Sequence, residues 1–178
     1  MRGISFAVLS GIGIATFAAL CCHAADRDLT LNDGMKGVIA PKTQIVWDIG
    51  NKAMDSQGNP DGSKFSDDDW KQIIAAGEQV SATAKALAGV DHLKVALPGV
   101  RIESEGDPGA WSAAEVQRAF DADPKAFQAH AMNLAAVTDA TVKAAKARDA
   151  RAMGDASNQI DAICEACHMQ FWYPNLKR

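Results

Sequence analysis

Close to its C-terminal end the chain carries Cys164-Glu165-Ala166-Cys167-His168. On an α-helix Cys164, Cys167 and His168 fall at i, i+3 and i+4, so all three side chains project from one face. Two thiols on that face can form thioether bonds with the two vinyl groups of a porphyrin, and the imidazole beside them can reach the iron. This spacing is typical of covalent haem attachment. The motif therefore predicts one covalent haem c, attached at Cys164 and Cys167, with His168 as an axial iron ligand.

Two other kinds of site use a Cys-x-x-Cys pair, a redox dithiol and half of a zinc site. A thioredoxin-like dithiol needs the motif at the start of a helix that follows a strand, whereas this motif lies in the last turns of the chain. A zinc site needs two more ligands close by. The other two of the four cysteines are Cys21 and Cys22, far away in sequence. Haem is the favoured interpretation, and the dithiol and the metal site stay as alternatives.

The N-terminus has the features of a secretory signal peptide. Arg2 gives a short basic region, Ile4 to Leu20 is apolar and rich in small residues, and the residues up to Ala24 form an A-x-A-like cleavage site. We therefore predict a signal peptide over residues 1–24 and a mature domain over residues 25–178. Because c-type haem is attached outside the cytoplasmic membrane of bacteria, this export signal and the haem motif agree, and both predict a periplasmic protein.

Two alternatives exist for this segment. A retained membrane anchor is disfavoured because the apolar run is near the lower length limit for a span and polar sequence follows at once. A lipoprotein anchored at Cys21 or Cys22 is disfavoured because Leu20 and Cys21 stand where a small residue is expected. Cleavage after Ala24 leaves Cys164 as the first cysteine of a mature chain that spans no membrane.

The charge balance limits the classes of partner. The chain has 18 Lys and Arg against 22 Asp and Glu, which gives a formal net charge of −4. An acidic protein is a poor candidate for binding nucleic acid or an anionic membrane surface. The negative charge suits docking to a basic patch on a redox partner protein, and it is equally an ordinary solubility feature.

The apolar residues repeat with helical period along the whole mature chain. The first helical stretch is predicted over residues 28–55. Pro41 interrupts it, and because proline removes one hydrogen bond and clashes with the preceding turn, we expect a kink near residues 37–40 or two shorter helices in line. Its apolar stripe is predicted to comprise Leu31, Met35, Val38, Ile45, Ile49 and Ala53.

Capping residues mark the later helices. Ser66 precedes three aspartates and opens a second helix that ends near Gly89. A long connection follows, in which a short helical turn would fit. Ser112 and Glu115 form a capping box for a short helix, Asp123 and Pro124 open the third long helix, and the fourth runs from about residue 150 to Phe171 before Pro174. This pattern predicts an all-α fold, an antiparallel four-helix bundle that encloses the haem.

With these features the chain resembles the cytochrome c prime family, the class II c-type cytochromes. The resemblance rests on the four long helices, on the single motif at Cys164 to His168 in the last of them, and on Phe171 three residues after the histidine. It covers residues 25–178. The family's fold is a left-handed four-helix bundle with one covalent haem. Ordinary class I cytochromes, in contrast, carry the motif near the N-terminus.

The resemblance implies roles for individual residues. Cys164 and Cys167 correspond to the thioether sites and His168 to the proximal ligand, which binds iron through Nε2. The family's distal residue comes from the first helix, where Met35 stands in this chain. A methionine ligates iron there in low-spin relatives, and an apolar side chain leaves the site open in high-spin relatives. A soft thioether suits haem iron, and methionine is also a common core residue, so both roles of Met35 stay open.

The sequence departs from the family at two positions. Trp172 stands after the family's phenylalanine, where many members have Arg or Lys, and Leu31 stands where many have a basic residue before the distal residue. The groups that pair with the haem propionates must therefore differ, with Lys36, Lys42 and Arg101 as candidates. The Phe-Trp-Tyr-Pro ending and Pro41 indicate a distinct subgroup.

Two functions follow for such a protein. The first is one-electron transfer with redox partner proteins, in which His168 and Met35 set the potential. The alternative is a five-coordinate haem that binds NO or CO at an open distal site. No acid–base pair or nucleophile stands beside the motif, so we do not expect an enzyme. His130 is either a distal or propionate-binding group or a residue at the edge of the core. Family members commonly form homodimers through their first two helices.

Overall fold

The structure is a computed structural model that describes residues 29–174. Within this range it is all-α and has no strand, only an isolated β-bridge between Met54 and Pro60. The predicted signal peptide, residues 1–24, lies outside the described residues, and so do its two cysteines. Its cleavage therefore stays a prediction.

Eight helical elements follow one another between residues 29 and 174. They are α1 (Leu31–Gly34), the π-helix η1 (Met35–Ile39), α2 (Ala40–Lys52), the 3-10 turn η2 (Gly62–Lys64), α3 (Asp67–Ala88), α4 (Ala113–Ala122), α5 (Pro124–Lys146) and α6 (Ala150–Phe171). The starts and ends of the predicted long helices agree with these bounds to within a few residues.

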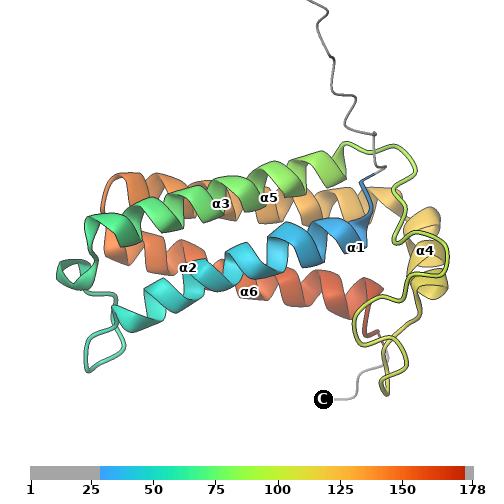
Figure 1. Cartoon of the computed structure of the whole chain (residues 1–178), viewed down its shortest axis with the longest axis horizontal. Coiled ribbons are helices and arrows are strands. Elements are labelled where there is room, and N and C mark those ends of the chain that lie inside the picture. Colours follow the sequence, from blue (N-terminus) through green and yellow to red (C-terminus); the bar gives the residue numbers. More distant parts are fainter. Residues whose placement is uncertain (1–28, 175–178) are drawn as a thin grey trace, which may run out of the picture.

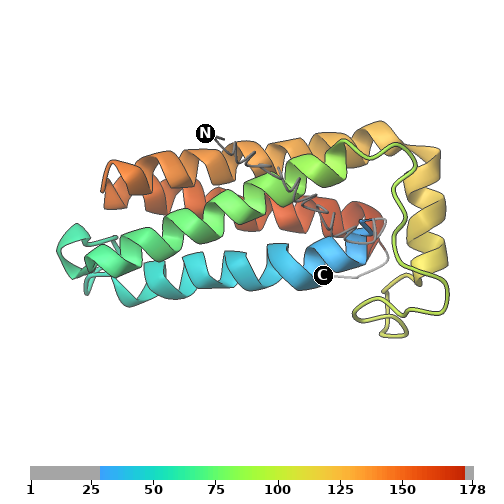
Figure 2. The same cartoon turned by 45° about the horizontal axis from the view of Figure 1, so that its top comes forward.

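Helices α3, α5 and α6 pack together in a bundle-like arrangement. Figures 1 and 2 show these three long helices lying side by side, with the continuous segment from α1 to α2 beside them. α2 packs mainly against α3 and makes few contacts with α6. The short helix α4 crosses one end of the bundle (Figure 2). An internal site would therefore lie between the sides of the long helices and not at the end that α4 crosses.

Pro41 explains the unusual start of the first long helix. The segment does not break there. It passes through a π turn in which the Ala40 N–H donates to the carbonyl oxygen of Met35, five residues earlier. A proline has no N–H to donate and its ring crowds the preceding turn, so a wider turn just before Pro41 accommodates it. The disturbance predicted near residues 37–40 is therefore a π turn.

The π turn also corrects the predicted apolar stripe. Leu31, Ile49 and Ala53 are buried as expected, but Val38 and Ile45 are only partly buried. The buried positions are Ile39 and Val46, each one residue later. A turn closed by an i to i+5 bond takes in one more residue than an α-helical turn, so the residues after it are shifted around the helix.

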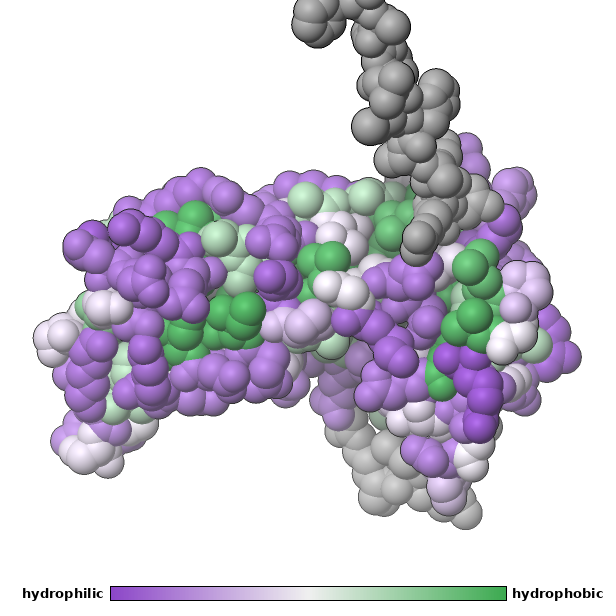
Figure 3. Space-filling view, viewed as in Figure 1, coloured by the Kyte–Doolittle hydropathy of each residue, from purple (hydrophilic) through white to green (hydrophobic). Residues whose placement is uncertain are grey.

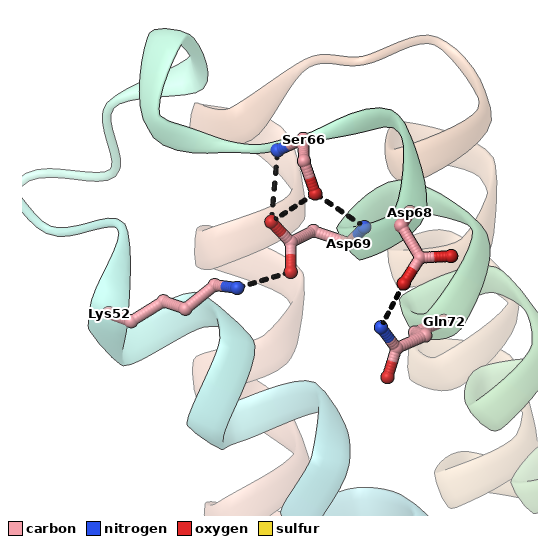
Figure 4. Close-up of polar contacts among 5 residues, drawn as sticks. All are labelled: Lys52, Ser66, Asp68, Asp69 and Gln72. Carbon is pink, nitrogen blue, oxygen red and sulfur yellow. Dashed lines mark hydrogen bonds and ion pairs between the residues drawn. The ribbon is translucent and has the colours of Figure 1, made fainter.

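The start of α3 confirms the predicted cap and adds an ion pair (Figure 4). Ser66 Oγ accepts from the Asp69 N–H at 3.1 Å, and Asp69 Oδ2 accepts in return from the Ser66 N–H at 2.9 Å. The other oxygen of Asp69 accepts a hydrogen bond from Lys52 at the end of α2. The capping box of α3 therefore also joins α2 to α3.

The remaining helix starts are confirmed in the same way. Ser112 and Glu115 form the predicted capping box of α4. Asp123 accepts from the Ala126 N–H at 3.0 Å and opens α5, whose first residue is Pro124. Caps such as these depend only on neighbouring residues, which is why the sequence predicts them well.

The contact between α3 and α5 is close because of Gly77. A Cβ at this position would lie 2.5 Å from Cγ2 of Val142 and 3.5 Å from Cγ2 of Thr138. The two helices are also joined by Asp139, which accepts from Ser81 at 2.6 Å and from Lys85 at 2.7 Å. Gly77 thus allows α3 and α5 to approach closely, and the bonds to Asp139 join the same two helices.

The long connection, residues 90–112, contains no helix. The short helical turn that the sequence allowed there is therefore absent. Two hydrogen bonds join the connection to the end of α6. The Trp111 N–H donates to the carbonyl oxygen of Trp172 at 2.9 Å, and Trp172 Nε1 donates to the carbonyl oxygen of Glu103 at 3.1 Å. The connection therefore covers the end of the helix that carries the cysteine motif.

The face seen in Figure 3 is mainly hydrophilic, and its hydrophobic residues stand in separate small areas. Between residues 29 and 174 no helix combines the length and the apolar character that crossing a lipid bilayer requires.

Candidate functional site

Cys164, Cys167 and His168 lie in the second half of α6, on the side that faces the interior of the bundle-like core. All three line a single cavity of about 220 Å³, and Met35 lines it as well. Its walls come from four segments, namely η1 with α2, α3, α5 and α6. The complete lining is Met35, Ile39, Ala40, Thr43, Gln44, Trp47, Ala84, Phe127, His130, Ala131, Leu134, Ile163, Cys164, Cys167 and His168. The residues predicted from the motif and from the first helix are therefore brought to one place.

The walls of the cavity are mainly apolar. Leu134 and Phe127 come from α5, Ile39 from η1 and Ile163 from α6, and Trp47 adds an indole ring. The polar side chains that line it are few, and no carboxylate is among them. A largely apolar lining with a few polar groups is typical of small-molecule sites.

Met35 reaches the cavity through the π turn that it begins. Counting from Thr43 in an unbroken α-helix, the residue two turns earlier on the same face is Lys36. The extra residue in the π turn moves Lys36 to the exposed side and leaves Met35 lining the cavity with Thr43. The wall that belongs to the first helix therefore contains the thioether of Met35 and not the ammonium group of Lys36.

Both thiols are free and half-buried. Burial raises the pKa of Cys164 to about 11, with a smaller contribution from the charge of Asp161. Burial also raises the pKa of Cys167 to about 12, with a smaller contribution from Cys164. Both side chains are therefore protonated thiols at neutral pH. A redox dithiol works through a thiolate with a lowered pKa, so these two pKa values argue against that alternative.

Burial lowers the pKa of His168, so its imidazole is neutral at neutral pH. The neutral form is the one that binds a metal ion. No group of three or more His, Cys, Asp or Glu side chains comes together in a metal-binding arrangement within residues 29–174. The zinc alternative stays untested.

The backbone around His168 is held at the end of α6. Its carbonyl oxygen accepts hydrogen bonds from the N–H groups of Trp172 and Tyr173, both at 2.7 Å. The side chain of Phe171 packs edge-on against Phe120, with ring centroids 4.8 Å apart. These contacts hold the last turn of the helix in place.

His130 lines the cavity from α5. Its Nε2 lies 2.8 Å from Oε1 of Gln170 on α6, within hydrogen-bonding distance. The imidazole ring also meets Phe171 edge-on, with centroids 6.1 Å apart. His130 therefore joins α5 to α6 at the edge of the cavity, and its role as a distal or propionate-binding group stays a prediction.

Several residues named from the sequence lie elsewhere. Lys36, Lys42 and Arg101, the three candidates for pairing with propionates, do not line the cavity. Arg101 donates instead to the carbonyl oxygen of Glu105. Trp172 is buried next to His168, with ring centroids 6.1 Å apart, but it is not part of the cavity wall.

Thr43 and Trp47, which no sequence motif marks, also line the cavity from α2. A second cavity, of about 500 Å³, lies between the start of the long connection and the turn from α4 to α5. It contains no residue of the cysteine motif, and Phe127 separates it from the first cavity because this side chain lines both.

The chain was compared with known proteins, and no family model, no curated protein and no solved structure matches it. The functional interpretation therefore depends on the residues of the cavity and on the sequence features described above.

Proposed function

We propose that this protein is an exported c-type cytochrome that carries single electrons. Its haem c is attached through Cys164 and Cys167, and His168 is the proximal iron ligand. The observation that carries this proposal is the shared cavity, which is apolar and is lined by both thiols, the imidazole and the thioether of Met35. When bound, haem c supplies reversible one-electron chemistry between ferric and ferrous iron.

The protonation states of the site suit the attachment of haem. Cys164 and Cys167 are present as thiols, the form that adds to a vinyl group, and neither is held in a disulfide. The neutral imidazole of His168 is ready to ligate a metal ion. The apolar side chains around them keep water away from the group that they hold.

The cavity is smaller than the roughly 300–1,000 Å³ usual for small-molecule sites, so its walls must move apart to admit haem. α2 is the wall best able to move, because it packs on α3 and makes few contacts with α6. In the proposed holoprotein, the segment from α1 to α2 completes an antiparallel four-helix bundle with α3, α5 and α6. This is the arrangement that the resemblance to cytochrome c prime implies.

Met35 is the proposed sixth ligand. It lines the same cavity as His168 and comes from a different segment of the chain, which suits a ligand on the opposite side of a metal ion. The alternative function is the binding of NO or CO by a five-coordinate haem. The apolar wall formed by Ile39 and Leu134 would surround such a ligand if Met35 does not bind iron. In either case we propose a carrier rather than an enzyme, because no carboxylate is among the cavity residues.

The proposed location and partners rest on the sequence. The predicted signal peptide over residues 1–24 implies export to the periplasm. The formal net charge of −4 suits docking to a basic surface on a redox partner protein. A homodimer formed through the first two helices is what the resemblance implies.

The test is expression of the full-length chain in a bacterial host that attaches c-type haem. On a denaturing gel, only covalently bound haem gives peroxidase staining. We expect staining at the size of the mature chain and none for the double variant Cys164→Ala/Cys167→Ala. The matched control is Ala166→Ser, an exposed position inside the motif, which should stain like the native chain. A native chain that is exported and folded but does not stain would refute the proposal.

A further inference from the structure

Thr43 is a buried polar residue in the wall of the cavity. It is 3% exposed, and its Oγ1 is the one buried side-chain oxygen or nitrogen of the described residues that has no hydrogen-bond partner. Burying a hydroxyl group without a partner costs stability, so such groups are rare in folded proteins. A position in the wall of a cavity suggests that the partner of this hydroxyl is a group bound there.

Two other buried threonines show that the free hydroxyl is particular to Thr43. On α5, Thr138 Oγ1 donates to the carbonyl oxygen of Leu134 at 2.7 Å, and Thr141 Oγ1 donates to that of Val137 at 2.9 Å. This bond to the residue four positions earlier is the usual way for a helical threonine to use its hydroxyl group. Thr43 is also helical and equally buried, but it does not make this bond.

Two other polar side chains of the cavity wall already have partners within the protein. The side-chain amide of Gln44 donates to Asp48 at 2.7 Å, and His130 pairs with Gln170. The basic residues considered for the propionates do not line the cavity. Thr43 is therefore a residue of the cavity wall whose buried hydroxyl is a donor that the protein does not use itself.

We propose that Thr43 Oγ1 donates a hydrogen bond to a carboxylate oxygen of the haem c bound in this cavity. The inference rests on the proposed function and extends it to a residue that positions the haem. The periphery of a haem is apolar except for its two carboxylates, and a carboxylate in an apolar cavity needs donors to replace water. A hydroxyl group in the wall supplies one of them without adding charge.

The test uses the holoprotein and three variants. Thr43→Val removes the hydroxyl group and keeps the size and branching of the side chain, whereas Thr43→Ser keeps the hydroxyl group. The matched control is Thr141→Val, the same change at a buried helical threonine that does not line the cavity. If Thr43→Val does not accumulate as holoprotein, Thr43→Ala takes its place with the same readouts.

The readout is the infrared difference spectrum between reduced and oxidised protein, with the haem carboxyl carbons labelled with ¹³C so that their bands are separated from those of Asp and Glu. We expect the labelled carboxylate band to shift in Thr43→Val, to return towards the native position in Thr43→Ser, and to stay in place in Thr141→Val. We also expect Thr43→Val to lower the reduction potential, because the negative charge of a carboxylate that has lost its donor stabilises ferric iron.

Two results would overturn the inference. In the first, the labelled band is the same in Thr43→Val and in the native protein. In the second, the band is unchanged but the C–O stretch of the ferrous CO complex shifts, which would place the hydroxyl group beside an iron-bound ligand. Both require covalent haem to be present, so a native chain without haem staining is distinguishable as a failure of the proposed function itself.

Discussion

The indole N–H of Trp172 donates to the carbonyl oxygen of Glu103 across 3.1 Å, 69 positions apart in the chain. Trp172 follows the last residue of α6 and Glu103 lies in the long connection, so this bond holds the connection against the end of the helix that carries Cys164, Cys167 and His168. Trp172 is therefore a structural anchor next to the site.

The first prediction concerns this anchor. Trp172→Phe should lower the free energy of unfolding by about 0.5–1.5 kcal/mol, because it removes one hydrogen bond and keeps most of the buried ring. Trp172→Ala should cost about 3–5 kcal/mol, since it also leaves a cavity. Urea unfolding measures both values. Trp111→Phe is the matched control, because the Trp111 indole N–H has no hydrogen bond among the described residues, and its smaller loss would confirm the role of the bond.

The second prediction concerns the close contact of α3 and α5. Gly77→Ala should destabilise the protein by about 1–3 kcal/mol, even though alanine favours a helix over glycine, because the new methyl group overlaps Cγ2 of Val142. Thermal and urea unfolding give the measurement. Adding Val142→Ala should make the Gly77→Ala change less costly than it is alone, which a double-mutant cycle detects.

Gly50→Ala is the control for this contact. No side chain lies within 4 Å of a Cβ placed at Gly50 on α2, so the same change there should stabilise the protein by about 0.5–1 kcal/mol. Equal effects of the two substitutions would contradict the close packing at Gly77.

The sequence predicted those parts of the fold that depend on neighbouring residues. The caps at Ser66, Ser112 and Asp123 and the stop after Phe171 lie where they were expected, because capping bonds span only three or four residues. The same reason applies to the cysteine motif. Its face is set by helical geometry alone, so Cys164, Cys167 and His168 line one cavity as expected.

The parts that the sequence did not predict depend on contacts between distant segments. Pro41 predicts a disturbance of the first helix, but the sequence does not distinguish a kink or a break from a π turn. The π turn selects Ile39 and Val46 for burial instead of Val38 and Ile45. Thr43 also lines the cavity, and no local pattern in the sequence marks it. The anchoring of Glu103 by Trp172 could not be predicted, because a bond across 69 positions leaves no local pattern.

The third prediction follows from the pKa of Asp69. The hydrogen bond from Lys52, followed by those from the hydroxyl and N–H groups of Ser66, lowers the pKa of Asp69 to about 2 (Figure 4). Because the pKa is lower in the folded protein, the unfolded chain binds the proton more readily at acid pH. This carboxylate therefore stabilises the protein above about pH 4, and its contribution is lost as the pH falls from about 4 towards 2.

Asp69→Asn should accordingly be less stable than the native protein at pH 7, and the difference should shrink as the pH falls through this range. Urea midpoints at pH 7, 5, 4 and 3 provide the measurement. Asp68→Asn is the matched control. It removes the same charge from the same helical turn, but the carboxylate of Asp68 contacts Gln72 and not Lys52. A difference that stays constant with pH for Asp69→Asn would contradict this assignment.

The last prediction concerns the sixth position on the proposed haem iron. Met35→Leu keeps an apolar side chain of similar size and removes the thioether, so it should leave covalent haem attachment unchanged. If Met35 binds iron, the native reduced protein has sharp low-spin bands and does not bind CO. The variant should then become high-spin, bind CO and have a lower reduction potential, since a methionine ligand raises the potential.

Met153→Leu is the matched control, because Met153 is buried on α6 and does not line the cavity. Its spectrum and its response to CO should equal those of the native protein. A native protein that is already high-spin and binds CO would rule out ligation by Met35 and support the alternative function. The reason for expecting ligation is that Met35 and His168 line the same cavity from different segments of the chain.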